Sequence, residues 1–416
     1  MLSLSSPPTD RAVSDPWAVA LAGAVALAVA MGIGRFAFTP LLPMMLADGV
    51  VDLHAASWLA SANYLGYLAG ALLCTFQPWI WARAPRLPPI DGPFLVRAGL
   101  AATGVLTLAM ALPLAGVWPA LRFAAGVASA LVFIYSSAWC LAQLARQGAT
   151  ALGGAIFAGP GTGIVVTGLL ASAMVAWDWR AANAWLVFGV LAFALSATVW
   201  GIFRGGPAAL HRAAGAPPIV HIERTAPVHG NAEVAALALA YGLAGFGYIV
   251  TATFLPVIAR QALPGSPWLD FFWPIFGCGV VVGAMLSTRL RVSGDLRLLL
   301  AAAYFMQAAG IGVNLWSPTL AGFAFGSLLL GLPFTTITFF AMQEVRRLRP
   351  ASVASVTGLL TAVYGVGQIV GPPLASLLLR RSGGAGGFTL SLEIAACALV
   401  GGATIYLWSV RAFPRS

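Results

Sequence analysis

Few side chains in this sequence could bind a small ligand, and the clearest are two arginines in otherwise apolar stretches. Arg35 lies within Met31-Gly-Ile-Gly-Arg-Phe-Ala-Phe-Thr-Pro-Leu-Leu-Pro43, and Arg122 follows Trp118 by four residues. A charge inside an apolar segment costs free energy unless it faces a partner or a wet cavity. Because arginine stays protonated, both could hold an anion such as a carboxylate, but neither could carry a proton.

Arg35 allows two interpretations. Its guanidinium either snorkels to a membrane surface or faces a cavity. The small residues Gly32 and Gly34 beside it favour the cavity, as does Pro40, which would free a backbone carbonyl that needs a polar neighbour. The same two interpretations apply to Arg122.

Two tyrosines are candidates to hydrogen-bond a ligand. Tyr241 and Tyr248 are seven residues apart, with Gly245 between them, so a helix would carry all three on one stripe. Tyr248 would equally suit the belt of aromatic residues at a membrane surface.

Side chains for proton transfer or catalysis are scarce. Glu393 is the one clear carboxylate inside an apolar run, suited either to proton coupling or to structural pairing, while Glu344 and Asp270 lie at the ends of runs. Lysine is absent, and all four histidines lie outside the apolar runs. The four cysteines fall singly in different runs and lack the spacing of metal ligands; they are Cys74, Cys140, Cys278 and Cys397. An enzyme, a metal site and a cofactor are therefore not expected.

The composition is that of a membrane protein. Hydrophobic residues make up 60% of the 416 positions, charged residues make up 8%, and the mean hydropathy is +0.90. Soluble domains carry about 25% charged residues. The net charge of +10 is dispersed between apolar segments and forms no basic stripe, so nucleic-acid binding is not expected.

Twelve apolar runs are long enough to cross a bilayer as helices, because a crossing needs about 20 residues. Their expected limits are Trp17–Met45, Ser57–Trp79, Phe94–Leu114, Trp118–Leu144, Ala151–Ala176, Ala182–Phe203, Val234–Ala259, Trp268–Thr288, Leu296–Trp316, Thr319–Gln343, Ser352–Leu379 and Phe388–Val410.

The loops predict how the chain lies in the membrane. Most arginines, Arg297 among them, fall at one set of alternate loops, which places these loops and both termini in the cytoplasm. The expected outer loops keep Arg180, Arg260, Arg380 and Arg381. The polar segment after the sixth run predicts a flexible cytoplasmic linker over residues 204–232. This linker would separate an N-terminal bundle, residues 1–203, from a C-terminal bundle, residues 233–416.

The two halves resemble each other. A shift of 213 residues pairs Gly32 with Gly245 and places Tyr248 opposite Arg35. A shift of 204 residues pairs the glycines of the fifth run with those of the eleventh: Gly154 with Gly358, Gly161 with Gly365 and Gly163 with Gly367. This order predicts an all-α membrane fold of two pseudo-symmetric six-helix bundles, the architecture of a transporter that rocks one half against the other.

Several motifs resemble those of the major facilitator superfamily (MFS). Arg122-Phe-Ala-Ala-Gly126 is similar to its fourth-helix motif, Gly159-Pro-Gly161 to the Gly-Pro motif of its exporters, and Gly283 to Arg289 to its loop signature after helix 8. The most specific segment, Gly32 to Pro43, resembles the YbfB-like bacterial branch. The resemblance covers nearly the whole chain.

The resemblance implies roles for further residues. It places Arg122 in a central cavity, and it puts Tyr64, Tyr135 and Gln368 on helices that line that cavity. Close packing and helix bending are expected at Gly159, Pro160, Gly163, Gly367 and Pro372. The segment from Gln77 to Arg86 departs from the family, because it lacks the Asp that pairs with an Arg to latch the outward-facing state.

The expected function is secondary active transport of a small organic anion past Arg35 and Arg122, by alternating access and with coupling to a proton or a counter-anion. The expected partners are this substrate and the lipid bilayer, and a monomer in the bacterial inner membrane is expected. Two alternatives remain. One is multidrug-type efflux of lipophilic compounds, favoured by the Gly-Pro motif, and the other is a membrane receptor or scaffold that transports nothing.

Overall fold

The computed structural model describes residues 15–83, 91–203, 231–266, 268–290, 294–350, 353–382 and 385–414. In this part of the chain all regular structure is helical, and twelve helices are long and apolar enough to cross a membrane. The predicted all-α fold of twelve spans is thus confirmed. The ends differ by a few residues; the third span, for example, ends at Ala109 and not at Leu114.

The N-terminal half contains six spans, of which the first and the fifth are broken. The first consists of α1 (Pro16–Leu27), the π-helical segment η1 (Ala28–Ile33) and α2 (Phe38–Ala47). The following spans are α3 (Leu53–Arg83), α4 (Gly92–Ala109), α5 (Trp118–Arg146), the pair α6 (Gly153–Phe157) and α7 (Gly159–Ala176) with the short helix η2 (Thr150–Leu152) before it, and α8 (Ala181–Val199).

The C-terminal half repeats this order. Its helices are α10 (Asn231–Ala262), the short helix η3 (Leu269–Phe271) with α11 (Phe272–Arg289), α12 (Leu296–Trp316), the pair α13 (Leu320–Gly331) and α14 (Phe334–Leu348), α15 (Val353–Ser382) and α16 (Ala385–Ala412). Residues 204–230 of the expected linker lie outside the described residues.

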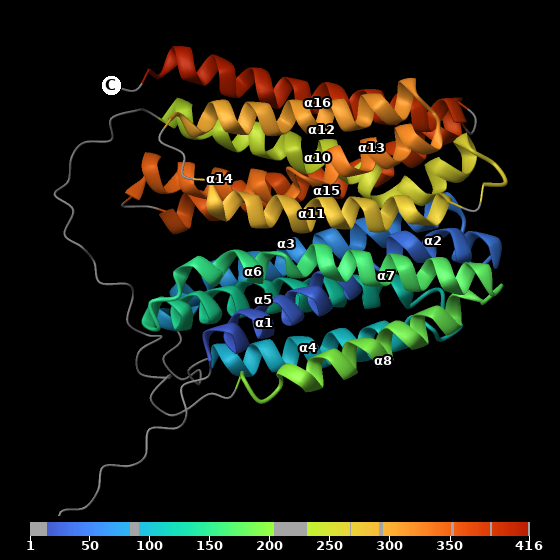
Figure 1. The fold of residues 1–416 in the computed structure, drawn as a ribbon, viewed down its shortest axis with the longest axis horizontal. Helices are drawn as coiled ribbons and strands as arrows, with labels where there is room; N and C mark the ends of the chain where they lie inside the picture. Colours follow the sequence, from blue (N-terminus) through green and yellow to red (C-terminus); the bar gives the residue numbers. More distant parts are fainter. Residues whose placement is uncertain are drawn as a thin grey trace, which may run out of the picture.

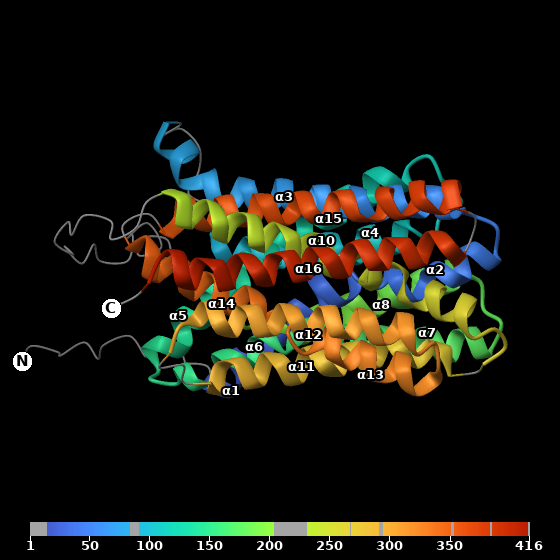
Figure 2. The ribbon, with the colours of Figure 1, turned by 90° about the horizontal axis from the view of Figure 1, so that it is seen from above.

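The two halves form two layers of roughly parallel helices. Figure 1 shows the N-terminal half in blue to green on one side and the C-terminal half in yellow to red on the other, and Figure 2 shows the bundle after a 90° turn. Helix α3 packs on α15, α7 on α11, and α2 on α10, so these pairs join the halves. The end of the bundle where α1 begins and α16 ends is called the termini end below, and the opposite end is called the far end.

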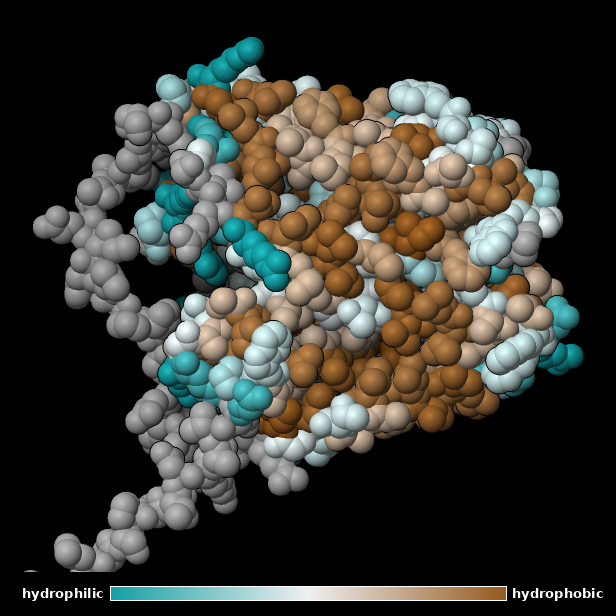
Figure 3. Space-filling view, viewed as in Figure 1, coloured by the Kyte–Doolittle hydropathy of each residue, from teal (hydrophilic) through white to brown (hydrophobic). Residues whose placement is uncertain are grey.

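The outer surface suits a lipid bilayer. Figure 3 shows hydrophobic side chains over the middle of the molecule and hydrophilic ones gathered towards the termini end. Large apolar side chains of the spans, such as Leu73, Val190 and Phe325, are exposed on this surface. In water such a surface would be costly, whereas lipid tails are equally apolar. The chain is therefore a multi-pass membrane protein.

Repeat-related glycines make repeat-related crossings within each half. A Cβ atom on Gly32 would lie 2.4 Å from the Cα of Gly163, so the first and fifth spans touch backbone to backbone. In the second half, a Cβ on Gly367 would lie 3.2 Å from the carbonyl carbon of Gly245. Because only glycine permits such an approach, these residues fix how closely the paired spans cross.

The interface between the halves follows the same symmetry. Gly154 faces Thr288, with 2.3 Å between its ideal Cβ position and the threonine Oγ1, and Gly358 faces Thr75, at 3.0 Å from Cγ2. The glycines are 204 residues apart and the threonines 213, the two shifts that relate the halves in the sequence. The halves therefore meet through two pseudo-symmetric helix pairs, α6/α7 with α11 and α15 with α3.

Candidate functional site

The first span breaks next to Arg35. Within η1 the backbone bonds are one residue longer than in an α-helix: Gly34 N–H donates to Val29 C=O and Phe36 N–H to Met31 C=O, both at 2.9 Å. Pro40 has no N–H for the carbonyl of Phe36, which accepts instead from Thr39 N–H at 3.1 Å. The carbonyls of Gly34 and Arg35 consequently lose their ordinary helical donors.

Arg122 satisfies these two carbonyls. Its Nη1 donates to Gly34 C=O at 3.2 Å and its Nη2 to Arg35 C=O at 3.0 Å. The side chain is 2% exposed, and its own backbone C=O accepts from Asn63 Nδ2 at 2.9 Å. The guanidinium of Arg122 is thus used to hold the break of the first span, and through it the backbone of Arg35.

The side chain of Arg35 points into the interface between the halves. It is 3% exposed, and its Nη2 donates to Oε1 of Gln368, on α15 of the other half, at 2.7 Å. Gln368 Nε2 in turn donates to the hydroxyl of Tyr248 on α10. Of the two interpretations left open by the sequence, the structure has the one in which Arg35 faces inward.

Arg35 has no carboxylate partner among the described residues. No described Asp or Glu makes a salt bridge with it, and its Nε is buried without a hydrogen-bond partner in this part of the chain. Aromatic rings surround the guanidinium, whose carbon lies 4.2 Å from the ring centre of Tyr67, 5.1 Å from that of Tyr64 and 5.3 Å from that of Phe36. These cation–π contacts offset part of the cost of the buried charge but do not neutralise it.

The rings around Arg35 belong to a larger group that spans both halves. Tyr248 stacks on Tyr364 with 5.9 Å between ring centres, and Tyr364 stacks on Tyr241 at 4.6 Å. We call the whole group the aromatic cluster; it consists of Phe36, Tyr64, Tyr67, Tyr241, Tyr248, Trp273, Phe276, Phe334 and Tyr364.

On the far-end side of Arg35, hydrogen bonds join the halves. Thr39 Oγ1 donates to Ala252 C=O and Ser61 Oγ to Ile369 C=O, each at 2.9 Å. Closer to the tip, a ring nitrogen of His54 lies 3.2 Å from Oγ of Ser376. His54 was expected in a loop but lies in the first turn of α3, because that helix begins at Leu53. The far end is closed by these contacts.

Two other candidates lie outside this group. Tyr135 is half-buried on α5 and donates to Oε1 of Gln77 at 3.4 Å. Glu393 is exposed on the surface of α16, where the membrane would be.

Of the residues expected to bend or pack helices, some lie at a helix break and others at close helix crossings. The fifth span breaks at Ala158, directly before Gly159 and Pro160, while α15 continues through Pro372 without a break. Gly163 and Gly367 lie at the close crossings described above.

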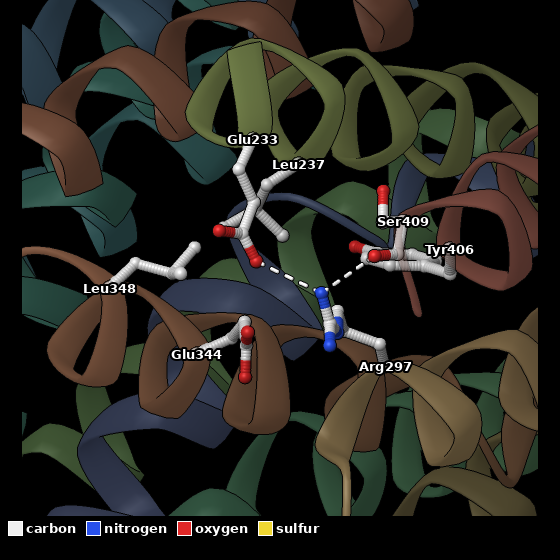
Figure 4. A pocket seen from close by; sticks show the side chains of 7 residues that line it. All are labelled: Glu233, Leu237, Arg297, Glu344, Leu348, Tyr406 and Ser409. Atoms are coloured by element: carbon white, nitrogen blue, oxygen red, sulfur yellow. Dashed lines mark hydrogen bonds and ion pairs between the residues drawn. The ribbon is translucent and has the colours of Figure 1, made fainter. Parts of the chain in front are cut away.

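The structure also contains a second buried arginine site, at the termini end of the C-terminal half. Arg297 is 2% exposed and donates to Oε1 of Glu233 at 3.0 Å and to Oδ2 of Asp295 at 2.7 Å. Figure 4 shows Glu233, Glu344 and Arg297 around one small cavity. Arg297 was expected among the charges of the cytoplasmic loops, but its side chain is buried. Its Nη1 donates both to Glu233 on α10 and to the carbonyl of Ser409 on α16, so Arg297 joins these two helices to its own helix, α12.

Sequence reasoning missed several of these residues. Tyr67 follows Tyr64 by three positions and Tyr364 precedes Gln368 by four, so helical spacing could have placed both beside the chosen candidates. Glu233 was overlooked because it lies one residue before the predicted start of the seventh span. Phe36 and Phe334 could not have been singled out, because nothing in the sequence distinguishes them from the many other apolar residues.

A duplicated twelve-helix bundle with buried polar side chains where its halves meet is an architecture found in membrane transporters. The chain belongs to the family described as "Uncharacterised MFS-type transporter YbfB", whose model matches residues 27–407. The resemblance noted in the sequence is thereby confirmed.

The fold is similar to two crystal structures of the nucleoside transporter NupG. A point mutant of NupG matches with a TM-score of 0.70 and 13% sequence identity, over 94% of this chain and 99% of that one. A second NupG structure matches with a TM-score of 0.66, also at 13% identity, over 96% of this chain and 99% of that one. At this identity the likeness shows the MFS fold and not the substrate. No curated protein matches the sequence.

Proposed function

We propose that the protein is a secondary active transporter that moves a small organic anion by alternating access, and that Arg35 binds the charge of this anion. One observation supports the proposal most. Arg35 is a buried, permanent cation where the halves meet, and the hydrogen bond of its guanidinium goes to the neutral amide of Gln368. A carboxylate would supply the missing countercharge.

A buried charge without a partner is costly, and this cost favours anion binding at Arg35. Removing an ion from water costs several kcal/mol unless an opposite charge and hydrogen bonds compensate. A carboxylate can accept two parallel N–H bonds from a guanidinium, and such charge-assisted bonds are about twice as strong as neutral ones. Arg35 has a free donor for this purpose, because its Nε is unpaired among the described residues.

Gln368 links anion binding to the movement of the halves. Its Oε1 occupies the position on Arg35 that a ligand carboxylate would take. Because Gln368 belongs to the opposite half, a ligand that displaces it also removes one of the contacts beside the closed far end. A ligand changes a conformational equilibrium only through such a difference in contacts between two states.

Arg122 has a different role in this proposal. Both of its terminal nitrogens donate to the carbonyls of Gly34 and Arg35, although its Nε, like that of Arg35, is buried without a partner among the described residues. We assign it as a positioning residue that holds the backbone of Arg35.

The coupling that the site supports is exchange of one anion for another. Arg35 cannot release a proton at physiological pH. Glu393 is exposed on α16 and is not among the residues that contact the cluster. We further propose that the transporter acts as a monomer in the bacterial inner membrane with its termini end in the cytoplasm, as the arginine distribution predicts.

The test is a thermal-shift screen of the purified protein with matched pairs of carboxylates and amides, such as acetate with acetamide and benzoate with benzamide. We expect carboxylates alone to raise the unfolding temperature, and the best of them to show counterflow in proteoliposomes. The variant Arg180→Gln serves as a control, because Arg180 is an exposed arginine outside the site. Equal stabilisation by acids and amides would contradict the proposal.

A second candidate is efflux of lipophilic compounds, which the aromatic cluster would suit. It predicts that a deletion strain becomes hypersensitive to amphipathic toxins. Organic-anion transport predicts instead a defect in growth on, or uptake of, a carboxylate.

A further inference from the structure

We infer that the transported anion is an aromatic monocarboxylate, whose single acid group binds Arg35 and whose ring stacks within the aromatic cluster. The inference rests on the proposed function and names its substrate class. It comes from three features of the site: rings contributed by both halves, a ring directly beside the cation, and a second arginine whose terminal nitrogens already bind backbone carbonyls.

Rings from the two halves contact each other across the interface. Phe36 of the N-terminal half lies 6.2 Å from Trp273 and 6.0 Å from Phe334 of the C-terminal half, measured between ring centres. When the halves separate during transport, these contacts are lost. A flat aromatic ligand can replace them, because its edge and faces offer the same tilted and stacked arrangements.

The C-terminal half presents a stack of its own. Tyr241 and Tyr364 are nearly parallel, with 28° between their ring planes, and Tyr364 and Tyr248 are inclined by only 23°. Phe334 meets Tyr248 edge-on, at 75°. A ligand ring inserted here can extend the stack and also meet an edge, whereas an aliphatic chain gains only from its buried area.

The stack begins close to the cation. The Arg35 guanidinium lies 4.2 Å from the ring centre of Tyr67, and Gln368, which it binds, also binds the hydroxyl of Tyr248. An acid group on Arg35 therefore has aromatic neighbours within about one ring's length. This spacing suits a short acid, with its carboxylate attached to the ring directly or through one carbon.

Of the two buried arginines at the site, Arg35 alone has a terminal nitrogen directed at the other half. Arg122 is turned to the carbonyls of Gly34 and Arg35, and polar groups near the rings are the neutral hydroxyls of Thr253 and Thr338, which bond Tyr64 and Tyr241. A second carboxylate on the ligand would have to displace the carbonyls of Gly34 and Arg35 from Arg122, which would leave these carbonyls without their described donors at a cost of about 1–3 kcal/mol each. The site therefore selects a monoacid.

The test is isothermal titration of the purified full-length protein with two ring pairs, benzoate against cyclohexanecarboxylate and phenylacetate against cyclohexylacetate. The acids of a pair have the same charge and similar size, so they differ mainly in aromaticity. We expect the aromatic member to bind about two- to tenfold tighter for each ring contact that it makes. Tyr364→Leu and Tyr241→Leu should each reduce this ratio.

Phe305→Leu is the matched control, because Phe305 is an aromatic residue of the same half that is 41% exposed on α12. It should leave the ratio unchanged. Equal or tighter binding of the saturated acids to the parent protein would overturn the aromatic inference and leave the anion proposal standing. If neither aromatic nor saturated acids bind while benzamide does, both are wrong.

Discussion

Arg35 and Arg297, two of the three arginines that are buried among the described residues, have opposite surroundings. Arg297 is 2% exposed and donates to two carboxylates, those of Glu233 and Asp295, while Arg35 is 3% exposed and donates to the amide of Gln368. Burial alone therefore does not mark a binding site. The difference lies in neutralisation: Arg297 has two carboxylate partners, whereas Arg35 has none among the described residues, and under the proposed function a ligand anion supplies the missing charge.

The two sites also differ in what they join. Arg297 binds residues of α10, α12 and α16, all in one half, and reaches the backbone of Ser409 and Phe413 near the end of the chain. Arg35 connects α15 to the break in the first span, across the interface of the halves. In the proposed alternating-access cycle, a bond within one half can persist, whereas a bond between the halves would be broken when the far end opens.

The largest expected effect is that of Arg297→Met on stability. Removing one partner of a buried ion pair leaves an uncompensated charge and typically costs about 3–5 kcal/mol. We expect a large fall in the free energy of unfolding, measured by denaturant titration in detergent micelles.

The control for this variant is Arg260→Gln. Arg260 also forms a salt bridge, to Asp270 at 2.5 Å, but its side chain is 29% exposed. Exposed pairs contribute about 0–1 kcal/mol, so the change should be small. Equal losses from both variants would show that Arg297 is not a special structural link.

Arg122→Met should have the next largest effect. It leaves the carbonyls of Gly34 and Arg35 without their described donors, and each unpaired buried acceptor costs about 1–3 kcal/mol. We expect a lower unfolding temperature together with weaker binding of the carboxylate found in the screen. Unchanged stability with normal binding would mean that Arg122 does not position Arg35.

Gln368→Leu should change affinity by a smaller factor and in the opposite direction. The net value of a hydrogen bond is about 0.5–1.5 kcal/mol, so removing the neutral competitor for Arg35 should tighten carboxylate binding about two- to tenfold. Titration calorimetry measures this directly. Weaker binding in the variant would indicate that Gln368 contacts the ligand and does not compete with it.

The smallest expected effect is that of Arg35→Gln on stability. The variant loses the hydrogen bond to Gln368 and the cation–π contacts with three rings, but it also removes a buried charge without a described countercharge. These changes oppose each other, so the free energy of unfolding should change by about 1 kcal/mol or less. A loss as large as that of Arg297→Met would remove the contrast between the two sites.

The fold could be predicted because its signals are local. The length of each apolar run sets each span, and the shifts of 213 and 204 residues revealed the duplicated halves before any contact was known. The crossings of Gly32 with Gly163 and of Gly245 with Gly367 then follow from symmetry and from the absence of a side chain.

The site could be predicted only in part, because its contacts are distant in the sequence. Arg35 and Gln368 were both candidates, but they are 333 positions apart, and nothing in the sequence paired them. The hydrogen bonds of Arg122 could not be predicted, because they depend on which backbone carbonyls lose their helical donors at the break in the first span. The pairing of Arg297 with Glu233 was hidden because both lie at the margins of the predicted spans.

The proposal depends above all on the binding of the substrate's charge by Arg35. This is tested by measuring the dissociation constant of the best carboxylate for the parent protein and for Arg35→Gln. Arg180→Gln is the control. A hydrogen bond to a charged group contributes about 1.5–3 kcal/mol, which corresponds to a loss of about ten- to hundredfold in affinity. We expect this loss in a variant that remains folded, and no change in the control. Binding by Arg35→Gln within twofold of the parent would contradict the proposal.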